Sequence, residues 1–403
     1  MTRVDHSFKI EPIQHESWKT CDMGAVITGL CINSISDAEV QRLKEAIWKH
    51  KVVVVRDQGE MLPEKQLELV LRLDPSAYAP TYEEDISYMY PRPEEIATKP
   101  RTSSLPISHL ISVVGKGKVG DHYGLKDLTL RGSMKGLEHE YAVPFSLKDL
   151  EEKGLTRFHY WHMDAPMYRR EPALFSSLRA IKLPSGPDLT VNWDDGSGLS
   201  MKMRPGATAF LSGELAYELL DDEQKAMADH SWVEYQPYWY EWTWPCRHET
   251  TGLGPVSEGR ERSDEHMRAL GEPRDEWVKR YPMVWIHPAS GRKLLQIHLP
   301  AVRRLFVRTS AADEKPTVVD DLAAARAICR QLYAPSFRPE HLFAGFAQAE
   351  GDLVLWDNRA TLHTKVAYPD RYGARVMHQV YVNSGTPPVG AGGGAVPAEG
   401  VVG

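Results

Sequence analysis

The first 75 residues alternate between runs typical of strands and runs typical of helices. Four consecutive valines in the segment 51–56, bounded by charged residues, are typical of a strand buried on both faces. A shorter β-type run occupies 25–28. Ser36 and Glu39 have the spacing of a capping box, and apolar residues then recur at helical spacing, so a helix is predicted to begin there. A second helix is predicted to begin at Pro63 and to run through residue 71.

From about residue 107 the pattern becomes mostly β. Helices are predicted near 213–229 and 319–333, residues 78–106 are predicted to be irregular surface chain, and the charged, glycine-punctuated region 246–280 is predicted to be an insertion. Many short strands at this spacing favour a β-sandwich or jelly roll. The predicted strands are 109–114, 157–163, 174–183, 189–193, 207–212, 283–286, 293–298 and 352–356. The glycine-rich tail, 384–403, is predicted to be a flexible extension.

Composition narrows the class of protein. The chain has 403 residues, of which 42% are hydrophobic and 26% charged, so it can bury a sizeable core. A net charge of −7 argues against a nucleic-acid partner. No stretch of 18 apolar residues could span a membrane, and the first residues have no apolar run typical of a leader, so we expect a cytoplasmic protein. The four cysteines contain no CxxC pair, which argues against a disulfide framework and a cysteine zinc site.

The candidate chemistry centres on His162 and Asp164, which lie two residues apart in a strand-like run and would share one face. The pair alone is weak evidence, but His363 could add a third ligand, and two histidines with one carboxylate form the facial triad of non-haem Fe(II) oxygenases. Arg375 follows His363 by twelve residues, and a planar guanidinium can bind a carboxylate through two hydrogen bonds. An oxygenase with a dicarboxylic co-substrate needs such a group, and Thr208 could add a hydroxyl donor.

These motifs resemble the taurine-dioxygenase family, whose members are Fe(II)/2-oxoglutarate-dependent dioxygenases on a double-stranded β-helix. The similar segments are Trp161-His162-Met163-Asp164, Trp356 to His363 and Arg375 to Gln379. Other segments resemble the fungal xanthine dioxygenase branch, namely Asp22–Thr28, Arg72–Ala77, Thr156–Phe158, Trp193–Gly198, Pro282–Trp285 and Gln296–His298. The resemblance extends over residues 20–383. It implies a mainly β fold with α (α+β), a double-stranded β-helix or jelly roll wrapped by helices, in a single domain, 1–383.

The resemblance also implies the roles of individual residues. His162, Asp164 and His363 match the iron ligands of the family. Arg375 matches the arginine that binds the distal carboxylate of 2-oxoglutarate, and Thr208 matches a threonine that assists it. With O2 as the second co-substrate, the expected reaction is oxidation of a C–H bond of a small polar substrate, with release of succinate and CO2. Fe(II) is the expected cofactor.

The substrate positions agree less well with the xanthine enzymes. Gln379 matches a glutamine near the purine. Leu110 stands where those enzymes have a glutamine, Arg131 where they have a lysine, and Tyr381 where they have an asparagine. A purine pocket depends on paired polar groups, so these differences argue against xanthine itself. Arg131, which with Lys135 is predicted to lie in a polar loop, would suit a carboxylate-bearing substrate such as an amino acid.

Other readings remain open at this point. The enzyme could be an amino-acid-directed oxidative cyclase or desaturase of fungal secondary metabolism rather than a hydroxylase of a heterocycle. A non-catalytic metal-binding jelly roll is the alternative outside the enzyme class. The aromatic stretch 235–245 is predicted to lie in the core or in the interface of a homo-oligomer, ahead of a role as a pocket wall. His298 is predicted to be a hydrogen-bonded core histidine.

Overall fold

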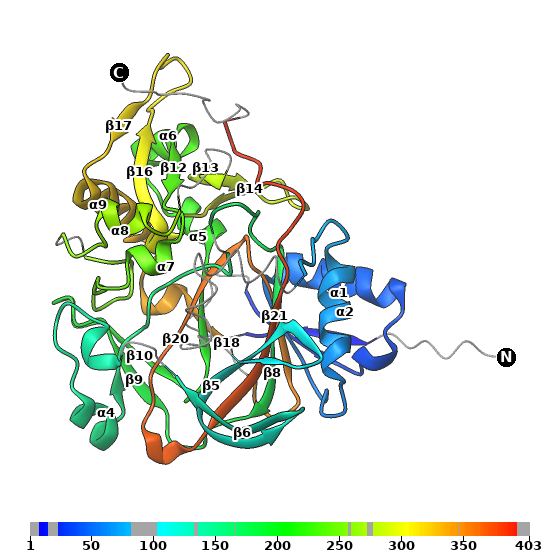
Figure 1. Ribbon diagram of the computed structural model, residues 1–403. Helices are drawn as coiled ribbons and strands as arrows, with labels where there is room; N and C mark the ends of the chain where they lie inside the picture. The colour runs from blue at the N-terminus through cyan, green and yellow to red at the C-terminus, as the bar shows by residue number, and fades with distance from the viewer. Residues whose placement is uncertain are drawn as a thin grey trace.

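The computed structural model describes residues 8–14, 23–81, 103–132, 136–165, 167–256, 259–271, 277–345 and 347–392. At its centre a large sheet faces a small one (Figure 1). The large sheet has the strand order β1 (Lys9–Pro12), β2 (Ala25–Thr28), β3 (Val52–Val55), β19 (Leu353–Asp357), β8 (Phe175–Lys182), β21 (Arg375–Tyr381), β5 (Ser108–His122) and β4 (Ser103–Leu105), with β6 (Leu125–Arg131) paired to β5. The small sheet has the order β18 (Leu342–Gly345), β11 (Thr208–Ser212) and β20 (Thr361–Lys365).

The valine run shows how the layers are held together. Val52 and Val54 pack towards the small sheet, in one cluster with Phe210 of β11. Val53 and Val55 point to the other side, where they pack with apolar residues of α1 (Asp37–His50) and α2 (Pro63–Leu73). Because alternate side chains of a strand face opposite ways, a strand between two layers is apolar throughout. The strand predicted to be buried on both faces is confirmed, and α1 and α2 cover the outer face of the sheet (Figure 1).

Helix α1 begins where the sequence predicts. The Ser36 hydroxyl accepts a hydrogen bond from the backbone N–H of Glu39, and the Glu39 carboxylate accepts one from the backbone N–H of Ser36. This reciprocal pair satisfies two N–H groups that a helix start otherwise leaves without partners. The capping box is therefore confirmed.

The remaining elements pack beside this sandwich (Figure 1). Further strands are β7 (Leu155–Thr156), β9 (Leu189–Asn192), β10 (Ser200–Met203), β12 (Trp232–Tyr235), β13 (Arg280–Pro282), β14 (Val284–Ile286), β15 (Lys293–Leu295), β16 (Val302–Val307) and β17 (Thr317–Val319). Further helices are α4 (Leu147–Lys153), α5 (Gly213–Glu218), α6 (Asp222–His230), α7 (Trp239–Trp242), α8 (Asp264–Arg268) and α9 (Leu322–Tyr333). Tyr235 and Trp239 of the aromatic stretch are buried in the largest apolar cluster, as its core interpretation predicts. Among the described residues, no helix is long and apolar enough to cross a membrane.

Four segments differ from their predictions. Residues 157–163 form no continuous strand; they make isolated bridges, Phe158 to Val366 and His162 to His363. The helix predicted at 213–229 is two helices, because Asp221 caps α6 through its own capping box. The strand predicted at 109–114 is part of the longer β5, and β4 lies at the end of the region predicted to be irregular, of which 82–102 fall outside the described residues.

The first part of the tail predicted to be flexible pairs with β14. The backbone N–H of Ile286 donates to the carbonyl of Val389 at 2.8 Å, and that of Ala391 donates to the carbonyl of Val284 at 3.2 Å. The chain after β21 thus adds to the edge of β14. Residues 393–403 lie outside the described part of the chain.

Candidate metal centre

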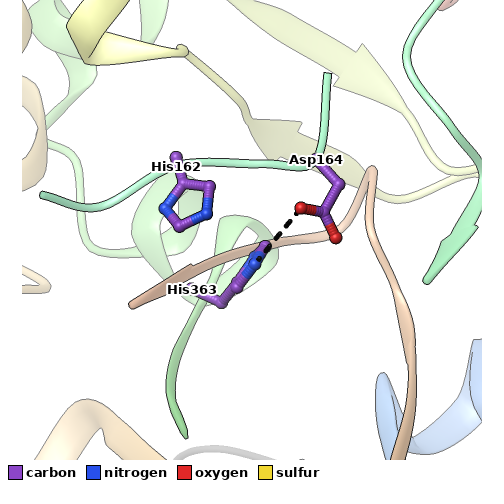
Figure 2. A group of neighbouring side chains, drawn as sticks. All are labelled: His162, Asp164 and His363. Atoms are coloured by element: carbon purple, nitrogen blue, oxygen red, sulfur yellow. Dashed lines mark ion pairs between the residues drawn. The ribbon is translucent and has the colours of Figure 1, made fainter. Parts of the chain in front are cut away.

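A backbone bridge brings the two candidate histidines together. The N–H of His162 donates to the carbonyl of His363 at 3.1 Å, and the N–H of His363 donates to the carbonyl of His162 at 2.8 Å. Residues that exchange both hydrogen bonds across an antiparallel pair project their side chains to the same face. The ring centroids are accordingly 4.3 Å apart (Figure 2). The spacing of the histidines is therefore set by the main chain.

Asp164 is held in place by Asn358, a fully buried residue in the turn between β19 and β20. The backbone N–H of Asp164 donates to the Asn358 Oδ1 at 2.8 Å, and the Asn358 Nδ2 donates to the Asp164 carbonyl at 3.0 Å. The same Nδ2 also donates to the carbonyl of Ala173 at 3.0 Å. The clamped carboxylate points to the histidines, with its Oδ1 3.7 Å from the His363 Nε2 (Figure 2).

The three side chains offer a ligand set suited to a divalent metal. One atom from each of His162, Asp164 and His363 can be chosen so that all lie within 4.8 Å of one another, and no other such group of three occurs among the described residues. The Nδ1 of His162 lies 3.1 Å from the carbonyl of Tyr160. A carbonyl is an acceptor, so that nitrogen carries the proton and leaves the Nε2 lone pair available for a metal. Two imidazole nitrogens and one carboxylate oxygen match the donors of non-haem iron sites.

Burial sets the protonation states of this group. It lowers the pKa of His162 to about 3, an effect that the neighbouring His363 strengthens, and it also lowers the pKa of His363 to about 3. Both imidazoles are therefore neutral at neutral pH, as metal binding requires. Burial raises the pKa of Asp164, while the neighbouring His162 opposes this shift.

Arg375 begins β21 and is buried. Its Nε donates to the carbonyl of Gly206 at 2.9 Å. Burial lowers the pKa of Arg375 to about 10, so the guanidinium is still charged at neutral pH. Thr208, two residues after Gly206, is buried and lies opposite Lys365 on β20. Burial raises the pKa of Tyr368 to about 12 and the charge of Arg375 opposes the shift, so this phenol also lies close to the guanidinium.

Three of the four predicted substrate residues lie on one face of the large sheet. Gln379 and Tyr381 are two residues apart on β21 and so share a face. Gln379 lies opposite Ser112 of β5, and Leu110, two residues before Ser112, shares that face too. The side-chain Nε2 of Gln379 lies 3.2 and 3.3 Å from the two carboxylate oxygens of Asp164. This face of the sheet therefore contacts Asp164, one of the three candidate metal ligands.

Arg131 lies farther out. It is the last residue of β6 rather than part of a loop, so the loop interpretation is wrong for this residue. It is exposed and pairs with Lys116 of β5, which places β5 between Arg131 and β21. Lys135 falls outside the described residues.

Two supporting residues were not predicted. Asn358 lies within a matched motif, so a signal was present, but the sequence does not show which group the amide binds. Gly252, inside the predicted insertion, accepts a hydrogen bond from the N–H of Trp161 at 3.0 Å. Its φ is +77°, and a Cβ there would lie 2.0 Å from the carbonyl oxygen of His159. The predicted core histidine, His298, is fully buried, and its Nδ1 accepts from the N–H of Met163 at 3.4 Å.

Comparisons with known proteins agree with this geometry. Residues 122–381 match the family model described as "Taurine catabolism dioxygenase TauD, TfdA family". The chain is 41% identical over 393 residues to the alpha-ketoglutarate-dependent dioxygenase bsc9 of Alternaria brassicicola, which covers 96% of this chain and 97% of the relative. It is 33% identical over 380 residues to the alpha-ketoglutarate-dependent xanthine dioxygenase xanA of Emericella nidulans, covering 93% and 96%.

Solved structures confirm the predicted jelly-roll fold. A putative alpha-ketoglutarate-dependent taurine dioxygenase from Burkholderia xenovorans superposes with a TM-score of 0.54, over 98% of this chain and 97% of that one. The sequence identity is 14%, so this likeness bears on the fold alone.

Proposed function

Because the chain belongs to the TauD/TfdA family of Fe(II)/2-oxoglutarate-dependent dioxygenases, we propose that His162, Asp164 and His363 hold its iron. The observation that carries this proposal is the convergence of the three ligand atoms within 4.8 Å of one another. Bound Fe(II), together with 2-oxoglutarate, supplies the activation of O2 that oxidises a substrate C–H bond. The residues of the chain bind and orient the co-substrate and the substrate, and they exclude water from the site.

We assign the far carboxylate of 2-oxoglutarate to Arg375, with Thr208 as an additional donor. The support is the buried guanidinium, which keeps its charge and is oriented by the carbonyl of Gly206. A bidentate pair of charge-assisted hydrogen bonds from a guanidinium to a carboxylate is strong where water is excluded. Thr208 begins β11, two residues after Gly206, and its hydroxyl is the proposed second donor to this carboxylate.

For the substrate we propose a small polar molecule, a heterocycle or an amino acid, bound against Leu110, Gln379 and Tyr381. Leu110 offers no hydrogen bond to a purine ring, and the amide N–H of Gln379 is engaged by Asp164, which argues against xanthine. The exposed Arg131 would serve a substrate carboxylate from the rim of the site. Hydroxylation is the proposed outcome, and ring closure or desaturation of an amino acid is the alternative. A cytoplasmic location and a homo-oligomeric state stay predictions.

The test is an anaerobic titration of the metal-free protein with Fe(II) and then 2-oxoglutarate. The expected result is the weak visible charge-transfer band of the Fe(II)–2-oxoglutarate chelate, absent in His162→Ala and Asp164→Ala and retained in His139→Ala, a control at an exposed histidine. Xanthine and small amino acids are then added, and the compound that shifts the band identifies the substrate type. A folded protein with no band would favour the non-catalytic jelly roll.

A further inference from the structure

The contact between Gln379 and Asp164 has a definite orientation. An ionised carboxylate can only accept hydrogen bonds, so the amide nitrogen of Gln379 must face it. The Nε2 distances to the two carboxylate oxygens, 3.2 and 3.3 Å, are nearly equal. The amide oxygen of Gln379 consequently points away from Asp164.

The two partners differ in how firmly their backbones are held. Gln379 lies in the middle of β21, paired with Leu178 of β8 on one side and with Ser112 of β5 on the other. Asp164 lies in a segment without a regular ladder, and Asn358 holds its main chain but not its side-chain torsions. The side chain of a residue fixed in a sheet can therefore orient a carboxylate that its own backbone leaves free to rotate.

We propose that Gln379 is a positioning residue that turns the carboxylate of Asp164 towards the two histidines. The inference rests on the proposed function, in which Asp164 is a metal ligand. If one carboxylate oxygen of Asp164 held the metal, the other would keep the hydrogen bond from Gln379, and this bond would fix the orientation of the ligand. Gln379 then contributes to metal affinity in the absence of any substrate, which a residue that only binds substrate would not do.

The experiment measures Mn(II) binding to the metal-free protein by electron paramagnetic resonance, without 2-oxoglutarate or substrate. Gln379→Met keeps the length of the side chain but cannot donate, and we expect its Kd for Mn(II) to rise about tenfold or more, the usual effect of losing a partner of a metal ligand. Gln379→Asn keeps the amide on a chain too short to reach, and the same loss is expected. Ser112→Ala, directly opposite on the same face, is the matched control and should bind as the unchanged protein does. The urea unfolding midpoint of each metal-free variant is measured alongside, and a purely structural role would move the midpoint and leave the Kd unchanged.

The possible outcomes separate this inference from the proposed function. Asp164→Ala should lose more Mn(II) affinity than either Gln379 variant. If Asp164→Ala binds Mn(II) normally, the proposed metal site is wrong. If Asp164→Ala loses binding while both Gln379 variants keep it, the metal site stands and the positioning role is refuted, which leaves Gln379 to the substrate.

Discussion

Replacement of Asn358 by alanine should both destabilise the protein and weaken the metal site. The Asn358 side chain makes three hydrogen bonds, to the N–H and carbonyl of Asp164 and to the carbonyl of Ala173, and the residue is fully buried. Alanine removes all three and leaves those backbone groups without water to replace the amide. A buried polar group without a partner costs about 1–3 kcal/mol, so the loss of partners for three such groups should cost about 3–9 kcal/mol of stability. That is a large share of the roughly 5–15 kcal/mol that a folded domain has.

The assay is urea unfolding of the metal-free protein, followed by the fluorescence of its 11 tryptophans. Asn33→Ala is the matched control, because the Asn33 side chain also makes a two-way clamp, donating to the carbonyl of Glu60 at 2.8 Å and accepting from the N–H of Leu62 at 3.1 Å, but in contact with water. The free energy of unfolding of Asn33→Ala should fall by about 1 kcal/mol or less, because water can replace the lost amide. Asn358→Asp keeps the acceptor for the Asp164 N–H but sets a carboxylate against two carbonyls, so it should be no better than alanine.

A second measurement tests the link to the site. If Asn358 fixes Asp164, Mn(II) affinity should fall in Asn358→Ala and remain unchanged in Asn33→Ala. The reasoning is refuted if Asn358→Ala loses no more stability than Asn33→Ala. It is refuted in part if stability falls but Mn(II) affinity does not, because the clamp would then support the fold without setting the ligand.

Three further predictions follow from the site. Arg375→Lys keeps the charge but loses the planar fork, so the 2-oxoglutarate concentration for half-saturation should rise about tenfold or more; an unchanged value would place the carboxylate elsewhere. Burial lowers the pKa of His162 and His363 from 6.5 to about 3 in the folded protein, so the unfolded chain takes up protons first as the pH falls. The metal-free protein should therefore lose stability between about pH 6.5 and 3 and show no change from these histidines above that window, and a variant with both residues changed to glutamine should lose less over it. In Gly252→Ala the new Cβ would clash with the carbonyl oxygen of His159, and the positive φ would strain the backbone as well. In Gly291→Ala, at φ +68°, no atom lies within 4 Å of the new Cβ, so only the backbone strain is added. The unfolding midpoint should fall much further for Gly252→Ala, and equal losses would contradict the clash.

Local patterns predicted the elements whose partners are near in sequence or whose burial is complete. The capping box at Ser36 and the valine run of β3 are of this kind. The segment 157–163 forms no continuous strand because its N–H groups donate to two different parts of the chain. The N–H groups of His159 and His162 donate to the carbonyls of Lys365 and His363 in β20, while that of Trp161 donates to Gly252. The alternation of a strand is present, but no continuous ladder forms, and the partners lie about 90 to 200 residues away, where no local pattern can indicate them.

The candidate site divides in the same way. The motifs indicated His162, Asp164, His363 and Arg375, and the structure brings the first three together. The polar sequence around Arg131 and Lys135 predicts a loop. Gly115, Gly117 and Gly120 have positive φ, and the register with β6 shifts on either side of Gly120, so the strand continues through a sequence that is not typical of a strand. An edge hairpin of this kind is difficult to predict from apolar alternation.

The metal side and the substrate side of this site depend on different parts of the fold. The histidines are paired through their main chains and Asp164 is clamped through its main chain, so the backbones of the three ligands are held without the sheet face opposite. The substrate face consists of side chains projecting from β5 and β21, which can change without moving the backbone. Leu110 and Tyr381 can therefore be exchanged to alter the substrate while the metal site stays intact. Gln379 is the exception, because its side chain lies on the substrate face and bonds to Asp164. A change at this position should alter substrate choice and metal affinity together, so specificity in this chain is easier to vary at the two neighbouring positions than at Gln379.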